Sequence, residues 1–79
     1  MTEENQARQI LTELIKAGMN TVHSSFQAKD IHAIEKLEKI AIGYYVAITS
    51  ILHPFPELFN EFIEKPELVI LRRIQRRYI

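Results

Sequence analysis

Residues 40–56 read IAIGYYVAITSILHPFP and contain no Asp, Glu, Lys or Arg, although these four types make up 25% of the chain. Immediately upstream, Glu35 to Lys39 are mostly charged. Apolar residues run through both parts at intervals of three and four, which is the period of a helix. Asp30 suits its N-cap, and Pro54 cannot continue its hydrogen bonds. We therefore predict a helix over residues 30–53 whose apolar stripe comprises Ile34, Leu37, Ala41, Tyr44, Ile48 and Ile51.

The polar face of this helix stops after Lys39, and apolar side chains take the positions that should face water. The uncharged helical part covers about thirteen residues, or roughly 20 Å, against about 30 Å for the hydrocarbon core of a bilayer. Tyr44 and Tyr45 lie in its middle, whereas aromatic residues of spanning helices gather at the membrane interfaces. We expect no spanning segment, and membrane association remains an alternative.

The N-terminal third of the chain predicts a helix over residues 3–26. Thr2 can cap it, and Glu3 and Glu4 suit the positive end of a helix dipole. We expect the helix to continue through Gly18, because the apolar stripe resumes in phase after it; the alternative is a C-cap that ends the helix at Ala17. The stripe comprises Ala7, Ile10, Leu11, Leu14, Ile15, Met19, Val22 and Phe26.

Prolines organise the remaining residues into shorter helices, predicted over 56–65 and 66–78. Pro56 suits the first turn of a helix, and Pro66 breaks or kinks the chain. The second of these segments places an apolar stripe along one face, which comprises Leu68, Leu71, Ile74 and Tyr78. The sequence thus predicts an all-α fold: a small helical bundle, built from a long antiparallel helical hairpin and a shorter third helix that is kinked or split. We expect a single domain over residues 1–79.

Composition limits the kinds of function that the chain can have. Its 79 residues carry ten basic and ten acidic side chains, so the whole chain is not a polycation. There is no Cys, which excludes disulfides, thiolate catalysis and Cys-based zinc sites. The polar, acidic N-terminus MTEENQARQ does not resemble a secretory signal, so a cytoplasmic location is expected.

The sequence contains no catalytic or metal-binding motif that would indicate an enzyme. His23, His32 and His53 are too far apart in sequence for any two to share one face of a helix. His32 and Glu35 lie one turn apart, but a metal site needs three or four ligands. We expect neither enzymatic activity nor a metal or cofactor.

Self-association is the leading expectation, because the second helix is apolar nearly all round from residue 40 to 52. A helix of that kind is normally buried on every side, and a chain this short has few neighbouring elements to bury it. A second copy related by two-fold symmetry would cover it. The predicted interface of this homodimer comprises Ile40, Ile42, Tyr44, Tyr45, Ile48 and Leu52.

The C-terminal arginines, Arg72, Arg73, Arg76 and Arg77, crowd into six positions after the last acidic residue, Glu67. They can cap a helix dipole or form salt bridges within the chain, bind an acidic protein partner, or contact the phosphates of nucleic acid or anionic lipid. The sequence as a whole predicts a small non-enzymatic interaction or regulatory protein that self-associates. The alternative is a nucleic-acid-binding module that uses these arginines.

Overall fold

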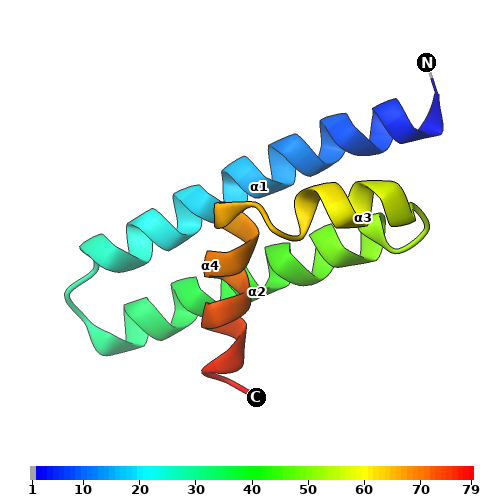
Figure 1. Ribbon diagram of the computed structural model, residues 1–79. Helices are drawn as coiled ribbons and strands as arrows, with labels where there is room; N and C mark the ends of the chain where they lie inside the picture. Colours follow the sequence, from blue (N-terminus) through cyan, green and yellow to red (C-terminus); the bar gives the residue numbers. More distant parts are fainter. Residues whose placement is uncertain (1) are drawn as a thin grey trace.

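The computed structural model describes residues 2–79, and in that range the fold is all-α, as predicted. It contains four helices and no strand: α1 Glu3–Gln27, α2 Ile31–Leu52, α3 Pro56–Phe62 and α4 Pro66–Arg76. The predicted domain range starts at Met1, which lies outside the described residues. Helices α1 and α2 form the long antiparallel hairpin, and α4 crosses it (Figure 1).

The structure tests three of the predicted capping positions, at Thr2, Gly18 and Asp30. The Thr2 hydroxyl accepts a hydrogen bond from the Asn5 N–H at 3.1 Å, which satisfies one free donor at the start of α1. Helix α1 is continuous through Gly18, so the alternative C-cap is wrong. Asp30 occupies the N-cap position of α2, but its side chain makes no capping hydrogen bond.

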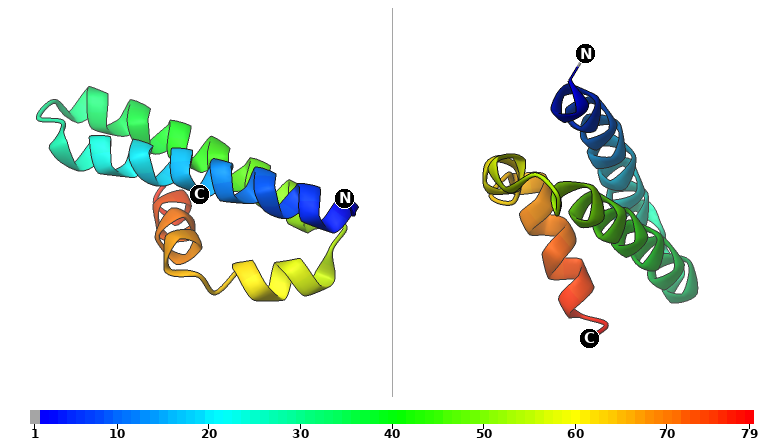
Figure 2. Two further views of the ribbon diagram at one scale, coloured as in Figure 1. Left: turned by 90° about the horizontal axis from the view of Figure 1, so that it is seen from above. Right: turned by 90° about the vertical axis from the view of Figure 1, so that its right-hand side faces the viewer.

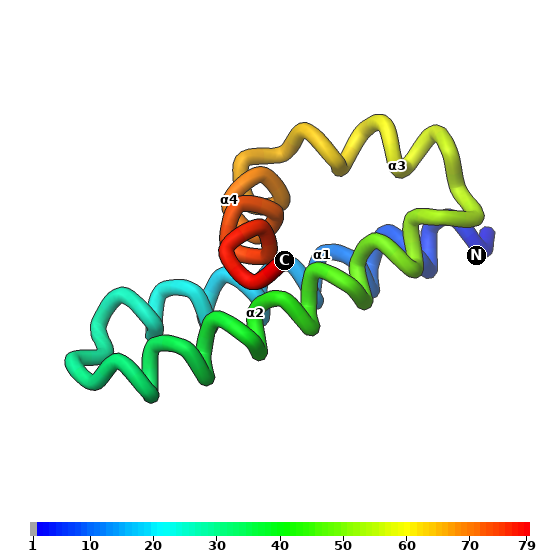
Figure 3. Tube along the Cα trace, turned by 90° about the horizontal axis from the view of Figure 1, so that it is seen from below, coloured from blue at the N-terminus to red at the C-terminus, as the bar shows by residue number. Residues whose placement is uncertain are grey.

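The third helical region is split at Pro66, which is one of the two forms that the sequence predicted. Helix α3 ends at Phe62, and the Lys65 N–H closes the turn by donating to the Phe62 carbonyl at 3.0 Å. Pro66 then starts α4, where its missing N–H costs nothing. The split lets α3 and α4 form a second layer on one side of the hairpin, as Figure 2 and Figure 3 show.

The buried arc of α2 is rotated from the predicted stripe. Ala41 and Ile48 are buried as expected, but Leu37, Tyr44 and Ile51 are only half-buried. Tyr45 and Leu52, which the sequence placed on the side facing water, are buried. The cause is the second layer: α4 and α3 pack on α2 in addition to α1. The core comprises Ala7, Leu11, Ile15, Val22, Ala41, Tyr45, Ile48, Leu52, Leu58, Phe62, Leu68, Leu71 and Ile74.

Two residues of the predicted stripe of α1 lie outside the core. Phe26 is 74% exposed because it is in the last turn of α1, and the hairpin extends past α4 at that end (Figure 1). Ile10 is 51% exposed. It is adjacent to Leu11 in the helix but rotated by about 100° from it, away from the buried face.

Gly18 is the point at which α1, α2 and α4 meet. A Cβ atom built on it would lie 3.3 Å from the Cβ of Tyr44 and 3.5 Å from Cδ1 of Leu71. Glycine therefore allows the backbones of α1 and α2 to approach closely where α4 packs over both. Gly43 is the matched contrast, because a Cβ there would meet no atom within 4 Å.

The two glycines should respond differently to alanine. Gly43→Ala should stabilise the fold by about 0.5–1 kcal/mol, since alanine is the better helix former. Gly18→Ala should gain less or lose stability, because Tyr44 must move to admit the methyl group. Urea unfolding followed by circular dichroism, at low protein concentration, measures both. Equal stabilisation by the two substitutions would show that Gly18 is not a tight contact.

Candidate interaction surfaces

The structure divides the six residues of the predicted interface into two groups. Tyr45, Ile48 and Leu52 are buried in the core of the chain itself, so they offer no surface to a second copy. Ile40 is exposed, and Ile42 and Tyr44 are half-buried. The surface that α2 offers to a partner is therefore narrower than the sequence predicted.

Helix α1 adds a second row of residues to the exposed part of this surface. Spacings of four, three and four place the members of each row on one side of their helix. We call the two rows together the open face: Ile10, Leu14, Ala17 and Thr21 of α1, with Ile40, Tyr44, Ala47 and Ile51 of α2. Ile10 and Ile40 are 51% and 43% exposed, and the other six are half-buried. None of the eight is charged.

The two rows meet in a shallow apolar hollow of about 300 Å³ in the middle of the hairpin. It is lined by Leu14, Ile40, Gly43, Tyr44 and Ala47. Helices α3 and α4 lie on the other side of the hairpin and leave this side bare, as both views of Figure 2 show. The predicted interface includes Ile40 and Tyr44 of the α2 row but not Ala47 or Ile51. It also lacks the α1 row, because the sequence places Ile10 and Leu14 in the apolar stripe of their helix.

The C-terminal arginines do not act as one group. The Arg77 guanidinium donates a hydrogen bond to the Glu38 carboxylate at 2.7 Å. The Tyr78 hydroxyl donates to the other oxygen of the same carboxylate at 2.8 Å. Lys39 also lies over the Tyr78 ring, with its ammonium 5.9 Å from the centroid. We call the three hydrogen-bonded residues the Glu38 latch, since they tie the end of α4 to α2.

Glu38 is the residue of this site that sequence reasoning missed. It was grouped with the solvated charges that precede residue 40, yet it is only 7% exposed. One signal was present: Glu38 lies four residues after Ile34 and three before Ala41, in phase with the apolar stripe. A carboxylate at such a position needs hydrogen-bond donors, and Arg77 and Tyr78 supply them.

The latch has an electrostatic consequence for Tyr78. The hydrogen bond to the Glu38 carboxylate raises the pKa of the Tyr78 hydroxyl above its ordinary value, and partial burial and the charge of Glu38 act in the same direction. Arg77 opposes the shift but does not cancel it. Ionisation of Tyr78 would remove the donor and place two negative charges together.

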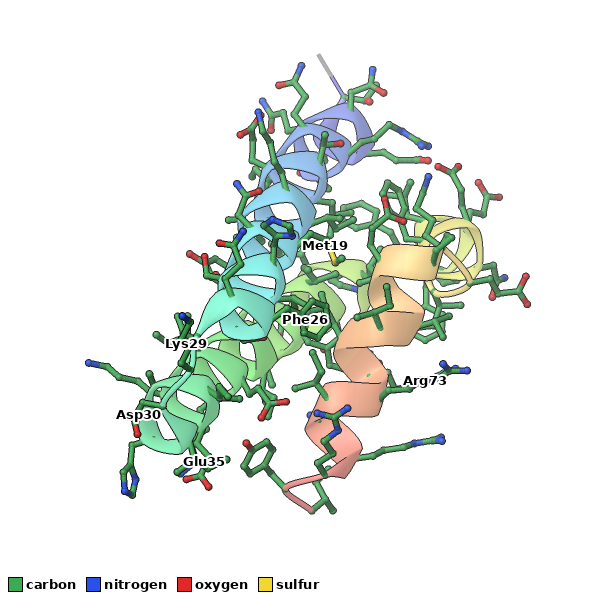
Figure 4. The ribbon with its side chains drawn as sticks, turned by 90° about the vertical axis from the view of Figure 1, so that its left-hand side faces the viewer. Met19, Phe26, Lys29, Asp30, Glu35 and Arg73 are labelled. Carbon is green, nitrogen blue, oxygen red and sulfur yellow. The ribbon has the colours of Figure 1, made fainter. Side chains whose placement is uncertain are left out.

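Arg72, Arg73 and Arg76 form the free arginine face of α4. Among residues 2–79 no carboxylate lies within ion-pair distance of any of the three. They fall within about 100° of one another around the helix. Figure 4 shows Arg73 pointing away from the hairpin into solvent. This face can contact an anionic partner without breaking an interaction that the fold uses.

The histidines and the remaining acidic side chains of residues 2–79 form no metal site. In the described part of the chain, no three His, Asp or Glu side chains come together as metal ligands. His32 and Glu35 are both exposed, and the His23 ring lies 3.3 Å from the Gln27 amide. Within residues 2–79, no helix has both the length and the apolar character needed to cross a membrane.

Comparison with known proteins gives no relative on which a function could be based. No protein-family model matches the chain, and no curated protein or solved structure matches it. The functional argument therefore depends on the surfaces of the chain itself.

The Glu38 latch predicts that the stability of the fold depends on pH at alkaline pH. Because folding raises the pKa of Tyr78 above about 10, its contribution to stability is full below pH 10 and is lost as the pH rises through the folded-state pKa. Tyrosinate absorbance measured against pH, minus that of the Tyr78→Phe variant, isolates the titration of Tyr78. We expect its midpoint to lie above that of an unperturbed tyrosine. Glu38→Gln should lower the midpoint. An unchanged midpoint in that variant would exclude Glu38 as the cause.

Proposed function

We propose that this chain is a non-enzymatic interaction protein that self-associates through the open face of its hairpin. The observation that carries the proposal is an uncharged, apolar side of α1 and α2 that α3 and α4 leave uncovered (Figure 2). Burying such a face against a second copy removes apolar surface from water, which is the main driving force for association.

The accessible surface and the dimensions of the chain are compatible with a partner bound at the open face. The accessible surface is 5466 Å², whereas a monomer of 9.3 kDa typically exposes roughly 5,000 Å². The molecule measures 44 × 23 × 17 Å, so the hairpin has an elongated side on which a partner can lie. A standard interface buries about 800 Å² on each partner. The 44 Å length of the hairpin is compatible with an interface of this size.

Chemistry and symmetry favour a second copy as the occupant. The absence of charge on the eight residues means that two copies can meet face to face without like-charge repulsion. A two-fold axis brings each residue of the surface onto the same surface of the partner. Ala17, Gly43 and Ala47 leave room for the helices of the two copies to approach, and the side chains of Ile10, Leu14, Ile40 and Tyr44 supply the apolar contacts.

Charge placed on the open face should abolish the dimer. In Ile40→Glu the carboxylate would be buried without a partner, so we expect the dissociation constant to rise at least about 100-fold. Ile40 is 43% exposed, so the monomer should keep its helix content by circular dichroism. Ile10→Glu places a charge on the α1 row of the open face, and we expect it to weaken the dimer in the same way. Sedimentation equilibrium at micromolar concentration gives the measurement.

Val46→Glu is the matched control for this experiment. Val46 lies on the same helix and is 48% exposed, but six residues from Ile40 it is rotated by about 120°. The control variant should therefore dimerise like the original chain. Self-association through the open face would be refuted if the original chain were monomeric, or if Val46→Glu weakened association as much as Ile40→Glu does. A different protein or a membrane surface would then be the occupant of the open face.

The free arginine face supports a second candidate function, nucleic-acid binding. Among residues 2–79, these three guanidiniums have no carboxylate within ion-pair distance, so they can bind phosphates. Their helix, α4, lies on the side of the hairpin opposite the open face (Figure 2). The chain should then bind a mixed DNA and RNA pool, more weakly as salt increases. Exchange of Arg72, Arg73 and Arg76 for Gln should abolish this binding. Arg77→Gln is the control that breaks the latch instead. Salt-independent binding, or none, would exclude this candidate.

A further inference from the structure

A hollow of about 500 Å³ lies on the α3 and α4 side of the hairpin, opposite the open face. It opens between the middle of α1 and the connection from α3 to α4. Sites for small molecules typically have volumes of about 300–1,000 Å³, apolar walls and a few polar groups. This hollow has that size, and its lining combines three apolar side chains with five polar or charged ones. Self-association through the open face would not cover it.

The floor of the hollow is apolar. Ile15 and Met19 come from successive turns of α1, and Phe62 comes from the end of α3. Ile15 and Phe62 are buried, whereas Met19 is half-buried. Figure 4 shows Met19 between α1 and the second layer, with its sulfur directed into the space between them. A flat apolar group could rest on these three side chains.

Two lysines line the hollow next to this floor. Lys16 projects from α1, and Lys65 lies in the connection before α4. The Lys65 ammonium is 5.1 Å from the centroid of the Phe62 ring, which keeps this positive charge beside the apolar floor. Among residues 2–79, neither lysine has a carboxylate within ion-pair distance. Both can therefore donate hydrogen bonds to a ligand.

The charge balance of the lining selects the ligand class. Glu67 is the one acidic side chain of the lining, against two lysines, so the formal charge of the hollow is +1. A single negative charge complements it, whereas a second negative charge would meet Glu67. We propose that the hollow binds small aromatic monocarboxylates, with the ring on Ile15, Met19 and Phe62 and the carboxylate accepting hydrogen bonds from Lys65 and Lys16.

Three naphthalene derivatives of nearly equal shape test the charge selection. Naphthoate is the anionic probe, naphthamide its neutral counterpart, and naphthylmethylammonium its cationic counterpart. Calorimetric titration of the full chain should show naphthoate binding at least about tenfold more tightly than either. Amide NMR signals of Thr12, Met19 and Lys65 should shift with naphthoate, while those of Ile40 and Gly43, in the hollow of the open face, should not.

Substitution of the lysines tests their roles. Lys65→Gln and Lys16→Gln should each weaken naphthoate binding about five- to tenfold without changing the affinity for naphthamide. Lys29→Gln is the matched control, since Lys29 lies in the turn between α1 and α2, far from the hollow (Figure 4). The proposal would be overturned if naphthoate did not bind, or if naphthamide bound with the same affinity. It would also be overturned if Lys29→Gln weakened naphthoate binding as much as the other two substitutions, or if naphthoate shifted the amide signals of the open face.

Discussion

The close approach of three helices at Gly18 is the contact on which the other features depend. A Cβ atom at residue 18 would lie 3.3 Å from the Cβ of Tyr44 and 3.5 Å from Cδ1 of Leu71, so little room is left for a side chain there. This contact sets the separation of α1 and α2 and places α4 against both, on one side of the hairpin. The Glu38 latch then fixes the far end of α4 with two charge-assisted hydrogen bonds to a nearly buried carboxylate.

This one-sided packing gives the hairpin two chemically different sides. The side covered by α3 and α4 holds the core and a hollow with lysines beside an apolar floor. The other side has no charge at its eight central positions, and no helix of residues 2–79 covers it. A chain of 79 residues has too few helices to cover both. Self-association and ligand binding are thus proposed for opposite sides, and neither blocks the other.

Particular residues show how far sequence reasoning reached. The all-α fold, the hairpin and the split at Pro66 were predicted, because helical period and proline are local signals. The residues of the predicted interface were only partly on the surface: Ile40 is exposed, whereas Tyr45, Ile48 and Leu52 lie in the core. Periodicity shows that a helix is apolar nearly all round, but it does not show which arc the rest of the chain covers.

The sequence by itself determined where the four helices begin to within one residue, because capping residues and prolines act on the residues next to them. It placed the end of α3 at residue 65, whereas α3 ends at Phe62. Only the tertiary structure decided which faces are buried, that Glu38 is bound by Arg77 and Tyr78, and that Lys16 and Lys65 share one hollow. These pairs are separated by about forty to fifty residues. Their positions relative to each other depend on how α3 and α4 pack on the hairpin, with Leu71 of α4 lying next to Gly18 of α1.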